Sequence, residues 1–342
     1  MSQTRRRGSK KTSRAAIDNS SFAIRHLWFV LMWVTSVYPA IGDDHPDLPP
    51  SHSIEPELYA TGFAFAEGPA LDRGGNLFAV NYRELGNIGR IAADGTASIW
   101  CVLQKVAPLE GRRPQANGLK VGRFGRLIVA DAGGGRLIRV AADGATAEVL
   151  ADRYDGSRLR AVNDVALDAA RNIYFTDPGG SSVDNPIGCV FRFDTANRLT
   201  QLDNELAFPT GVGITPDQKH LCVAESERFR ILIYDLETDG SVTNRRVLIE
   251  FPEEDEGAIR GGKHFPDGLV FDEKGRLYVA MWTGRVINVV EVPSGKLIRQ
   301  YSAGGNKATN CHFHGDYLYT TVVAKEAVFR LKLGVAGFDY RK

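Results

Sequence analysis

Oxygen-bearing side chains recur at matched places in this sequence, and their types suit the binding of a hard metal ion. One such residue stands eight to eleven positions before each of six strand-like segments. In five of the six copies the next residue is Gly or Asp, as in Glu67-Gly68 and Asn163-Asp164. The six residues are Glu67, Asn117, Asn163, Thr210, Asp267 and Asn310.

These residues would form a ring if the six segments surround one axis. Two carboxylates and several neutral oxygens aimed at one point repel or stay unsatisfied unless a cation lies between them. No ring position is His or Cys, so we expect one hard ion, Ca²⁺ first, with Mg²⁺ or Mn²⁺ as alternatives. The softer ion Zn²⁺ is a further alternative. Taken singly, each residue could simply start a strand and satisfy nearby backbone donors. Because all six stand at the same place in their repeats, we favour the metal site.

A sequence repeat supplies the elements that would position this ring. Runs of small and β-branched residues, each preceded by a turn, recur six times at intervals of 41 to 56 residues. A second turn follows five of the runs, as at Asp94-Gly95 and Ser294-Gly295. This spacing predicts an all-β protein, a six-bladed β-propeller with one blade per repeat. The runs begin at Leu77, Leu127, Ile173, Leu221, Leu277 and Leu318.

The sixth repeat lacks its second turn, because the chain ends soon after it. We expect the strand-like segment at residues 58–65 to complete the last blade and so remove free sheet edges. A β-sandwich would need shorter, less regular spacing, and a βαβ fold would need helices, whose periodicity is absent after residue 50.

The beginning of the chain differs in composition from the rest. The first 25 residues hold seven Lys or Arg and one acid, and a 15-residue apolar run follows from Leu27 to Ile41. That run is short for a bilayer span and suits a signal peptide. We expect a leader at residues 1–45, a propeller domain at 46–342, and export to the periplasm or exterior. The alternatives are an uncleaved membrane anchor or a mis-assigned start codon.

Charge and cysteine content exclude several classes. The net charge is +1, which gives no basis for nucleic-acid binding, and we expect no membrane contact beyond the leader. The four cysteines include no CxxC pair, which argues against a zinc cluster. Cys189 and Cys222 lie in strand-like runs and read as buried thiols, while disulfide pairing stays open. We expect a monomer that acts on a small molecule.

The sequence resembles the family of senescence marker protein (regucalcin), gluconolactonases and related lactonases from about residue 57 to 323. The motifs that carry this resemblance are FAEGPALD, VNDVALDAARNIYFTDP, FPTGVGITPDQKHLCVAES, FPDGLVFDEKGRLYVA and ATNCHF.

The resemblance implies that Glu67, Asn163, Thr210 and Asp267 hold the metal. Thr210 departs from the family, because relatives usually have PNG where this chain reads PTG. A hydroxyl is a weaker and shorter-reaching ligand than an amide carbonyl. Either Thr210 coordinates directly or through water, or the ion shifts toward Asn117 or Asn310.

The chemistry expected of such a site is metal-dependent hydrolysis of a sugar-type lactone. The cation would polarise the carbonyl, and Asp267 would act as the base. We predict that Asn117, Arg160 and His264, on the loops that enter the channel, bind the substrate. These loops form the rim of the channel, and they carry other basic residues such as Arg112 and Lys263.

Three alternatives remain from the sequence. One is a non-catalytic calcium-binding or ligand-binding propeller, and another is an aryl-ester or organophosphate hydrolase of the same architecture. A condensing enzyme like strictosidine synthase is the third, although that family does not need the two carboxylates. The sequence contains no GxSxG motif or phosphate-binding loop, so a serine triad finds no support. Asp131, Asp177 and Glu225, at strand ends, are interpreted as blade-packing or channel residues rather than catalytic ones.

Overall fold

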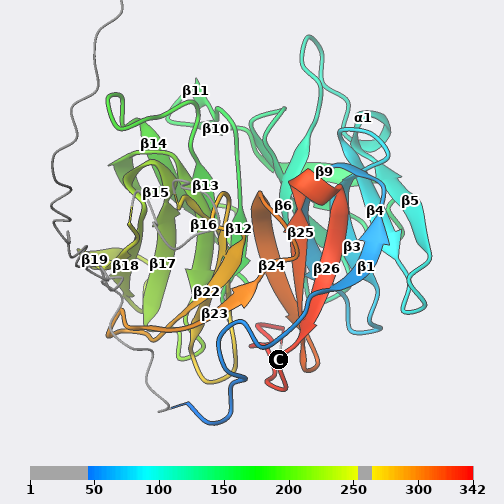
Figure 1. Ribbon diagram of the computed structural model, residues 1–342. Helices are drawn as coiled ribbons and strands as arrows, with labels where there is room; N and C mark the ends of the chain where they lie inside the picture. Colours follow the sequence, from blue (N-terminus) through cyan, green and yellow to red (C-terminus); the bar gives the residue numbers. More distant parts are fainter. Residues whose placement is uncertain (1–44, 253–263, 342) are drawn as a thin grey trace, which may run out of the picture. The chain divides into compact units, whose positions relative to one another are not determined.

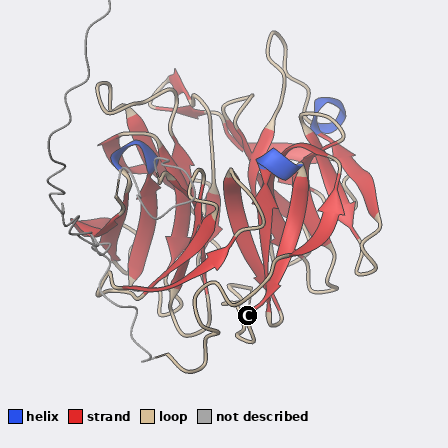
Figure 2. Ribbon diagram, viewed as in Figure 1, coloured by secondary structure: helices blue, strands red, loops and turns tan. Residues whose placement is uncertain are grey.

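The computed structural model describes residues 45–252 and 264–341. Nearly all of the predicted leader lies outside these residues, as does Lys263, so cleavage and export stay predictions. Within the described part of the chain, no helix has the length and apolarity to cross a membrane. Strands make up 52% and helices 3% of the structure, and the strands form six blades around a channel, which confirms the predicted propeller (Figures 1 and 2).

Each blade is a four-stranded antiparallel sheet whose innermost strand borders the channel. The first blade contains β2 (Phe63–Leu71), β3 (Leu77–Tyr82), β4 (Asn87–Ile91) and β5 (Ala97–Val102). The second contains β6 (Ala116–Val121), β7 (Leu127–Asp131), β8 (Arg136–Val140) and β9 (Ala147–Ala151). The third contains β12 (Val165–Leu167), β13 (Ile173–Asp177), β14 (Gly188–Phe193) and β15 (Leu199–Leu206).

The other blades repeat this order. The fourth contains β16 (Pro209–Ile214), β17 (His220–Glu225), β18 (Arg230–Leu236) and β19 (Val242–Glu250). The fifth contains β20 (Pro266–Phe271), β21 (Leu277–Met281), β22 (Val286–Val290) and β23 (Leu297–Ser302). The sixth contains β24 (Ala308–His314), β25 (Tyr317–Val322), β26 (Ala327–Lys332) and β1 (Glu57–Thr61). Short elements between strands are α1 (Leu103–Val106), β10 (Arg153–Tyr154), β11 (Ser157–Arg158), η1 (Ser226–Arg228) and η2 (Val323–Lys325).

The core lies between neighbouring blades. The second strand of each blade is mostly apolar, and in β3, β7, β13 and β21 every residue is buried. Strands buried on both faces favour the β-branched and aromatic residues found in these runs. Outer strands such as β9 and β19 are partly exposed. The four cysteines are buried and free of disulfides.

The chain closes the propeller by pairing its first strand with its last. Glu57 of β1 lies opposite Arg330 of β26, and the two side chains form an ion pair at 2.7 Å. The segment before the first repeat therefore completes the last blade, as predicted. Its predicted end at residue 65 is wrong, because β1 ends at Thr61. Gly62 then adopts φ +95°, which favours glycine, and turns the chain into the innermost strand β2.

The C-terminal tail covers one end of the channel. Its backbone and side chains reach the last residues of three innermost strands: Phe338 N donates to Phe271 O (3.0 Å), Tyr340 Oη to Val121 O (3.2 Å) and Arg341 Nη1 to Leu71 O (2.7 Å). Because innermost strands of a propeller all run the same way along the axis, the tail lies at the end of the channel away from the strand starts. The strand starts form the other mouth.

Candidate metal centre

Five of the six predicted ring residues lie at or near the start of an innermost strand, and Glu67 lies in the middle of β2. Of the six, five are within β2, β6, β16, β20 and β24, and Asn163 stands two residues before β12. Neighbouring innermost strands contact one another in sequence order and close the circle between β24 and β2. The structure therefore brings these side chains to one mouth of the channel.

Close backbone approaches link each ring position to the next blade. Gly118 N donates to Asn163 O at 2.8 Å, and Thr309 Oγ1 donates to Ala66 O at 2.8 Å, which joins the sixth blade to the first. A Cβ on Gly68 would collide with the carbonyl of Asn117, and the φ of Gly68 is +51°. The glycine that follows a ring residue thus lets adjacent strands approach.

Glu67 and Asp267 are the two ring carboxylates, and Glu67 is buried in the channel whereas Asp267 is half-buried. Glu67 is 5% exposed. Burial and the nearby Asp164 raise the pKa of Glu67 to about 8, although Gly68 N donates to its Oε2 at 3.0 Å. Burial, followed by the charges of Glu67 and Asp164, raises the pKa of Asp267 well above its ordinary value. Carboxylates that disfavour one another's charge in this way share one electrostatic site.

Asp164 is a third carboxylate of this site, and the prediction omitted it. Its Oδ1 accepts from Val165 N at 2.9 Å, while its Oδ2 is buried and has no hydrogen-bond partner among the described residues. Burial raises its pKa, and the charge of Lys120 opposes that shift. The sequence held a signal, since Asp164 stands where Gly follows the ring residue in four other blades.

Thr210 is buried and its hydroxyl is already in contact with protein oxygens. Its Oγ1 lies 2.7 Å from Ser226 Oγ and 3.2 Å from the carbonyl oxygen of Pro266. Ser226 Oγ also donates to Pro266 O. If the Thr210 proton goes to either neighbour, only the hydroxyl lone pairs remain for a ligand. Sequence reasoning missed Ser226, which follows a second strand rather than an innermost one.

The other neutral ring residues differ in exposure. Asn117 and Asn163 are half-buried, whereas Asn310 is buried and its Oδ1 accepts from Cys311 N at 2.8 Å. No group of three or more His, Cys, Asp or Glu side chains within metal-binding range occurs in residues 45–252 and 264–341. A metal here would therefore need amide and hydroxyl oxygens beside Glu67 and Asp267.

Acidic residues at the ends of the second strands hold the backbone segments that lead into the ring residues. Asp131 Oδ1 accepts from Gln115 N at 2.7 Å, two residues before Asn117. Glu225 Oε1 likewise accepts from Ala207 N at 2.9 Å, three residues before Thr210.

The third blade repeats this arrangement. Asp177 accepts from Arg160 N and Ala161 N at 2.9 and 2.8 Å, just before Asn163. The structure places these three acids in packing roles, as the sequence indicated.

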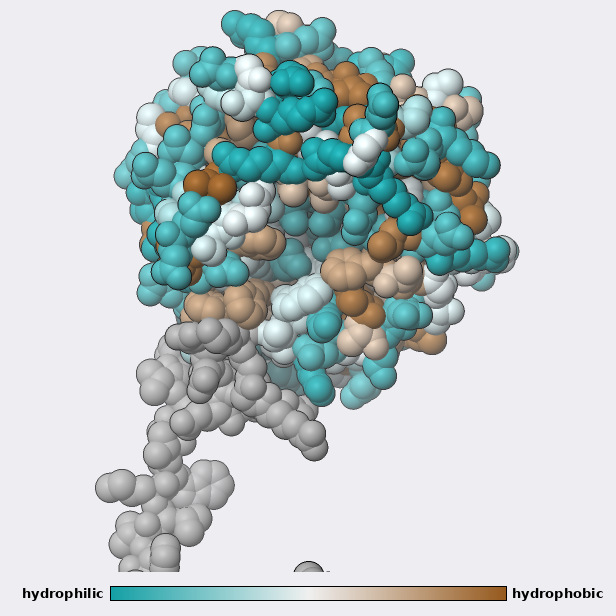
Figure 3. Space-filling model, turned by 90° about the horizontal axis from the view of Figure 1, so that it is seen from above, coloured by the Kyte–Doolittle hydropathy of each residue, from teal (hydrophilic) through white to brown (hydrophobic). Residues whose placement is uncertain are grey.

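The loops around this mouth carry the remaining predicted residues. Arg160 is exposed, and its Nη1 donates to Ile187 O at 2.5 Å. His264 is 1% exposed and its ring lies against Gly284, so its predicted contact with the substrate stays a prediction. Aromatic residues also border the rim, since Phe65 stacks on Trp282 with ring centroids 5.9 Å apart. Figure 3 looks onto this end, where hydrophobic patches interrupt a mostly hydrophilic surface.

The fold and the ring define a six-bladed β-propeller with an oxygen-lined candidate site on its axis. The chain belongs to the SMP-30/gluconolactonase/LRE-like family, whose pattern matches residues 65–324. It is 28% identical over 298 residues to a gluconolactonase of Zymomonas mobilis, covering 82% of each chain. It is also 28% identical over 277 residues to the diisopropyl-fluorophosphatase of Loligo vulgaris, covering 72% of this chain and 82% of that one.

Solved structures show the same fold. A gluconolactonase of Xanthomonas campestris superposes with a TM-score of 0.65 at 22% identity, covering 87% of this chain and 99% of the other. Regucalcin of Agrobacterium tumefaciens, described as a calcium-binding protein, gives a TM-score of 0.67 at 17% identity, covering 85% and 97%. These relatives include a gluconolactonase and a fluorophosphatase, so the family includes hydrolases.

Proposed function

We propose that the protein is a hydrolase that opens a sugar-type lactone and uses one divalent cation held by the ring. The observation that carries this proposal is the pairing of Glu67 with Asp267. Both lie at one mouth of the channel, Glu67 buried and Asp267 half-buried, and burial together with the charge of Glu67 raises the pKa of Asp267. A cation between them would relieve that repulsion and supply the partner that buried charges require.

The available donors fit a hard ion. Glu67, Asn163, Thr210 and Asp267 would hold it, all through oxygen, and Asn117 or Asn310 could replace the weaker Thr210 hydroxyl. Ca²⁺ accepts six to eight oxygen ligands in flexible geometry, so a mixed set of carboxylates, amides and a hydroxyl suits it best. The unpartnered Oδ2 of Asp164 adds negative charge beside this set.

The chain's own groups have distinct roles in the proposed reaction. A bound cation would polarise the lactone carbonyl and stabilise the negative charge that develops on its oxygen. Asp267 accepts a proton from the attacking water, which its ionised form can do. Arg160 and Asn117, at the rim, orient a hydroxylated or acidic substrate. His264 is buried, so its part would be to support the rim rather than to contact the substrate.

A substrate panel with and without chelator tests the proposal. Purified protein should hydrolyse at least one aldonolactone, lose that activity after EDTA treatment, and regain it with Ca²⁺. Release of acid is followed with a pH indicator. A protein that binds Ca²⁺ but turns over no member of the panel is instead the non-catalytic calcium-binding propeller. Full activity in the presence of EDTA would refute the metal-dependent mechanism.

A second activity deserves a place in that panel because of one relative. The fluorophosphatase of Loligo vulgaris matches 72% of this chain. Both reactions need a nucleophile and a cation acting on a polarised oxygen, C=O in a lactone and P=O in a fluorophosphate. Diisopropyl fluorophosphate and aryl esters therefore serve as rival substrates, and a higher kcat/KM for either would change the assigned substrate class.

A further inference from the structure

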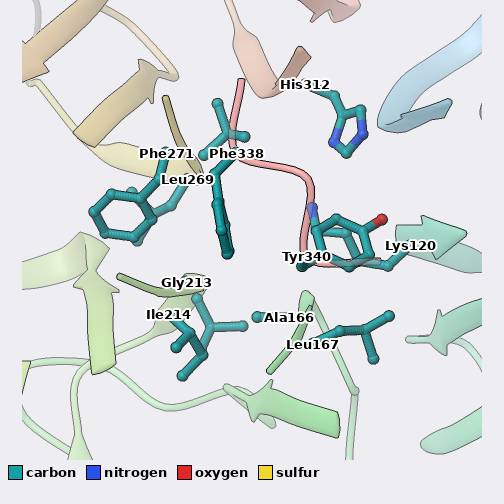
Figure 4. Close-up of a pocket in the computed structure, with 12 residues that line it drawn as sticks. Lys120, Ala166, Leu167, Gly213, Ile214, Leu269, Phe271, His312, Phe338 and Tyr340 are labelled. Carbon is teal, nitrogen blue, oxygen red and sulfur yellow. The ribbon is translucent and has the colours of Figure 1, made fainter. Parts of the chain in front are cut away.

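One buried cationic side chain lies in the channel below the ring. Lys120, in β6, is 5% exposed and lines a cavity of about 40 Å³ together with Ala166 and His312. The tail residues Phe338 and Tyr340 also line this cavity. Figure 4 shows Lys120, His312 and Tyr340 on the same side of it. The tail thus helps to seal Lys120 inside the protein.

Strand geometry places Lys120 beside Asp164. A Cβ on Gly118 would collide with Oδ1 of Asp164, so that carboxylate lies against β6 at Gly118. Lys120 follows two residues later, and alternate residues of a strand project from the same face about 7 Å apart.

No ion pair between described residues includes Lys120. A buried ammonium is stable only when anionic or polar groups compensate its charge. The anionic groups at hand in the channel are the three acids of the ring mouth. When all three acids are ionised they carry three negative charges. The positive charge of Lys120 reduces the net charge of the channel to two negative charges.

We propose that Lys120 sets the charge of the cation that the ring accepts, matching two net negative charges to one divalent ion. Lys120 is a positioning residue here, since it acts through Asp164 and the channel field rather than on substrate. This inference rests on the metal site proposed above. If the charge is removed, three unbalanced carboxylates should favour a trivalent ion, because electrostatic compensation is strong in a buried site.

The test compares Ca²⁺ with La³⁺, which is similar in size and also prefers oxygen ligands. Both are titrated calorimetrically into metal-free protein in a non-phosphate buffer. The Lys120→Met variant, whose side chain is also unbranched but one atom shorter, should raise the ratio of La³⁺ to Ca²⁺ affinity at least tenfold. Lys120→Arg, which keeps the charge, should retain the ratio of the unmodified protein. Arg126→Met removes an exposed charge at the tail end of the molecule and should also leave the ratio unchanged.

The outcomes separate this inference from the proposed function. If the unmodified protein binds neither ion, the metal site itself is wrong and the role of Lys120 falls with it. If it binds Ca²⁺ but Lys120→Met leaves the affinity ratio unchanged, only the role of Lys120 is refuted.

A double-mutant cycle covers the case in which Lys120→Met does not fold. Asp164→Asn alone leaves one net negative charge and should weaken Ca²⁺ binding about tenfold. Combined with Lys120→Met, it restores two negative charges without leaving either partner buried alone, and Ca²⁺ affinity should recover. Additive losses in the double variant would overturn the charge-matching role.

Discussion

At the level of single residues, Asp267 combines two properties that the proposed chemistry needs. It lies in the ring, and its carboxylate is held in an environment that disfavours its charge until a cation is present. Asp267→Ala should therefore lower kcat for lactone hydrolysis by about 10²–10³-fold, as when one preorganised electrostatic group is removed. Steady-state kinetics measures this, with circular dichroism to show that the variant is folded. An unchanged kcat would remove Asp267 from the mechanism.

Thr210 is the ring position at which this chain departs from its relatives. Thr210→Asn offers an amide carbonyl with longer reach and should tighten Ca²⁺ binding, while loss of the contact with Ser226 costs about 1 kcal/mol of stability. Thr210→Val keeps the shape and removes the oxygen, so it should weaken binding. Calorimetric titration compares the two variants. Equal Ca²⁺ affinity in Thr210→Val and the unmodified protein would show that Thr210 is not a ligand.

At the level of elements, the acid at the end of β13 connects blade packing to the ring. Asp177 accepts two backbone N–H groups just before Asn163. Asp177→Ala leaves both donors without this acceptor and should cost about 1–3 kcal/mol of unfolding free energy per unsatisfied group.

Because Asn163 stands two residues after Ala161, Ca²⁺ affinity should fall as well. Urea denaturation and calcium titration measure the two effects. Asp184→Ala, on the exposed loop after β13, is the matched control and should change neither. Loss of stability with Ca²⁺ affinity intact would restrict Asp177 to a packing role.

The strands themselves were predictable, because each second strand is a mostly apolar or β-branched run bounded by turns. The closing strand was predictable in place but not in length, since its end depends on the positive φ of Gly62. The ring residues were predictable because they occupy matched positions in the six repeats. Asp164 and Lys120 were not predictable, because their importance comes from contact between side chains of neighbouring blades. The burial of His264 depends on Gly284, which lies 20 residues away in sequence.

At the level of the whole molecule, the buried acids make stability depend on pH when no metal is bound. The pKa of Glu67 is raised from 4.5 to about 8 in the folded protein, so between these values the folded state binds more protons than the unfolded state. The free energy of unfolding of the metal-free protein should therefore fall as pH rises from about 4.5 to about 8. Thermal melts across this range measure the fall.

Saturating Ca²⁺ should reduce this dependence, because a bound cation favours the ionised carboxylates. Glu67→Gln removes one of the titrating groups and should flatten the profile of the metal-free protein. Stability that rises with pH across the interval, in protein without metal, would contradict the shared electrostatic site.

The account depends on one cation between Glu67 and Asp267, and calcium titration of chelator-treated protein tests this most directly. We predict one Ca²⁺ bound per chain, with affinity reduced at least tenfold in both Glu67→Gln and Asp267→Asn. Absence of calcium binding in the unmodified protein, or binding that neither substitution changes, would contradict it.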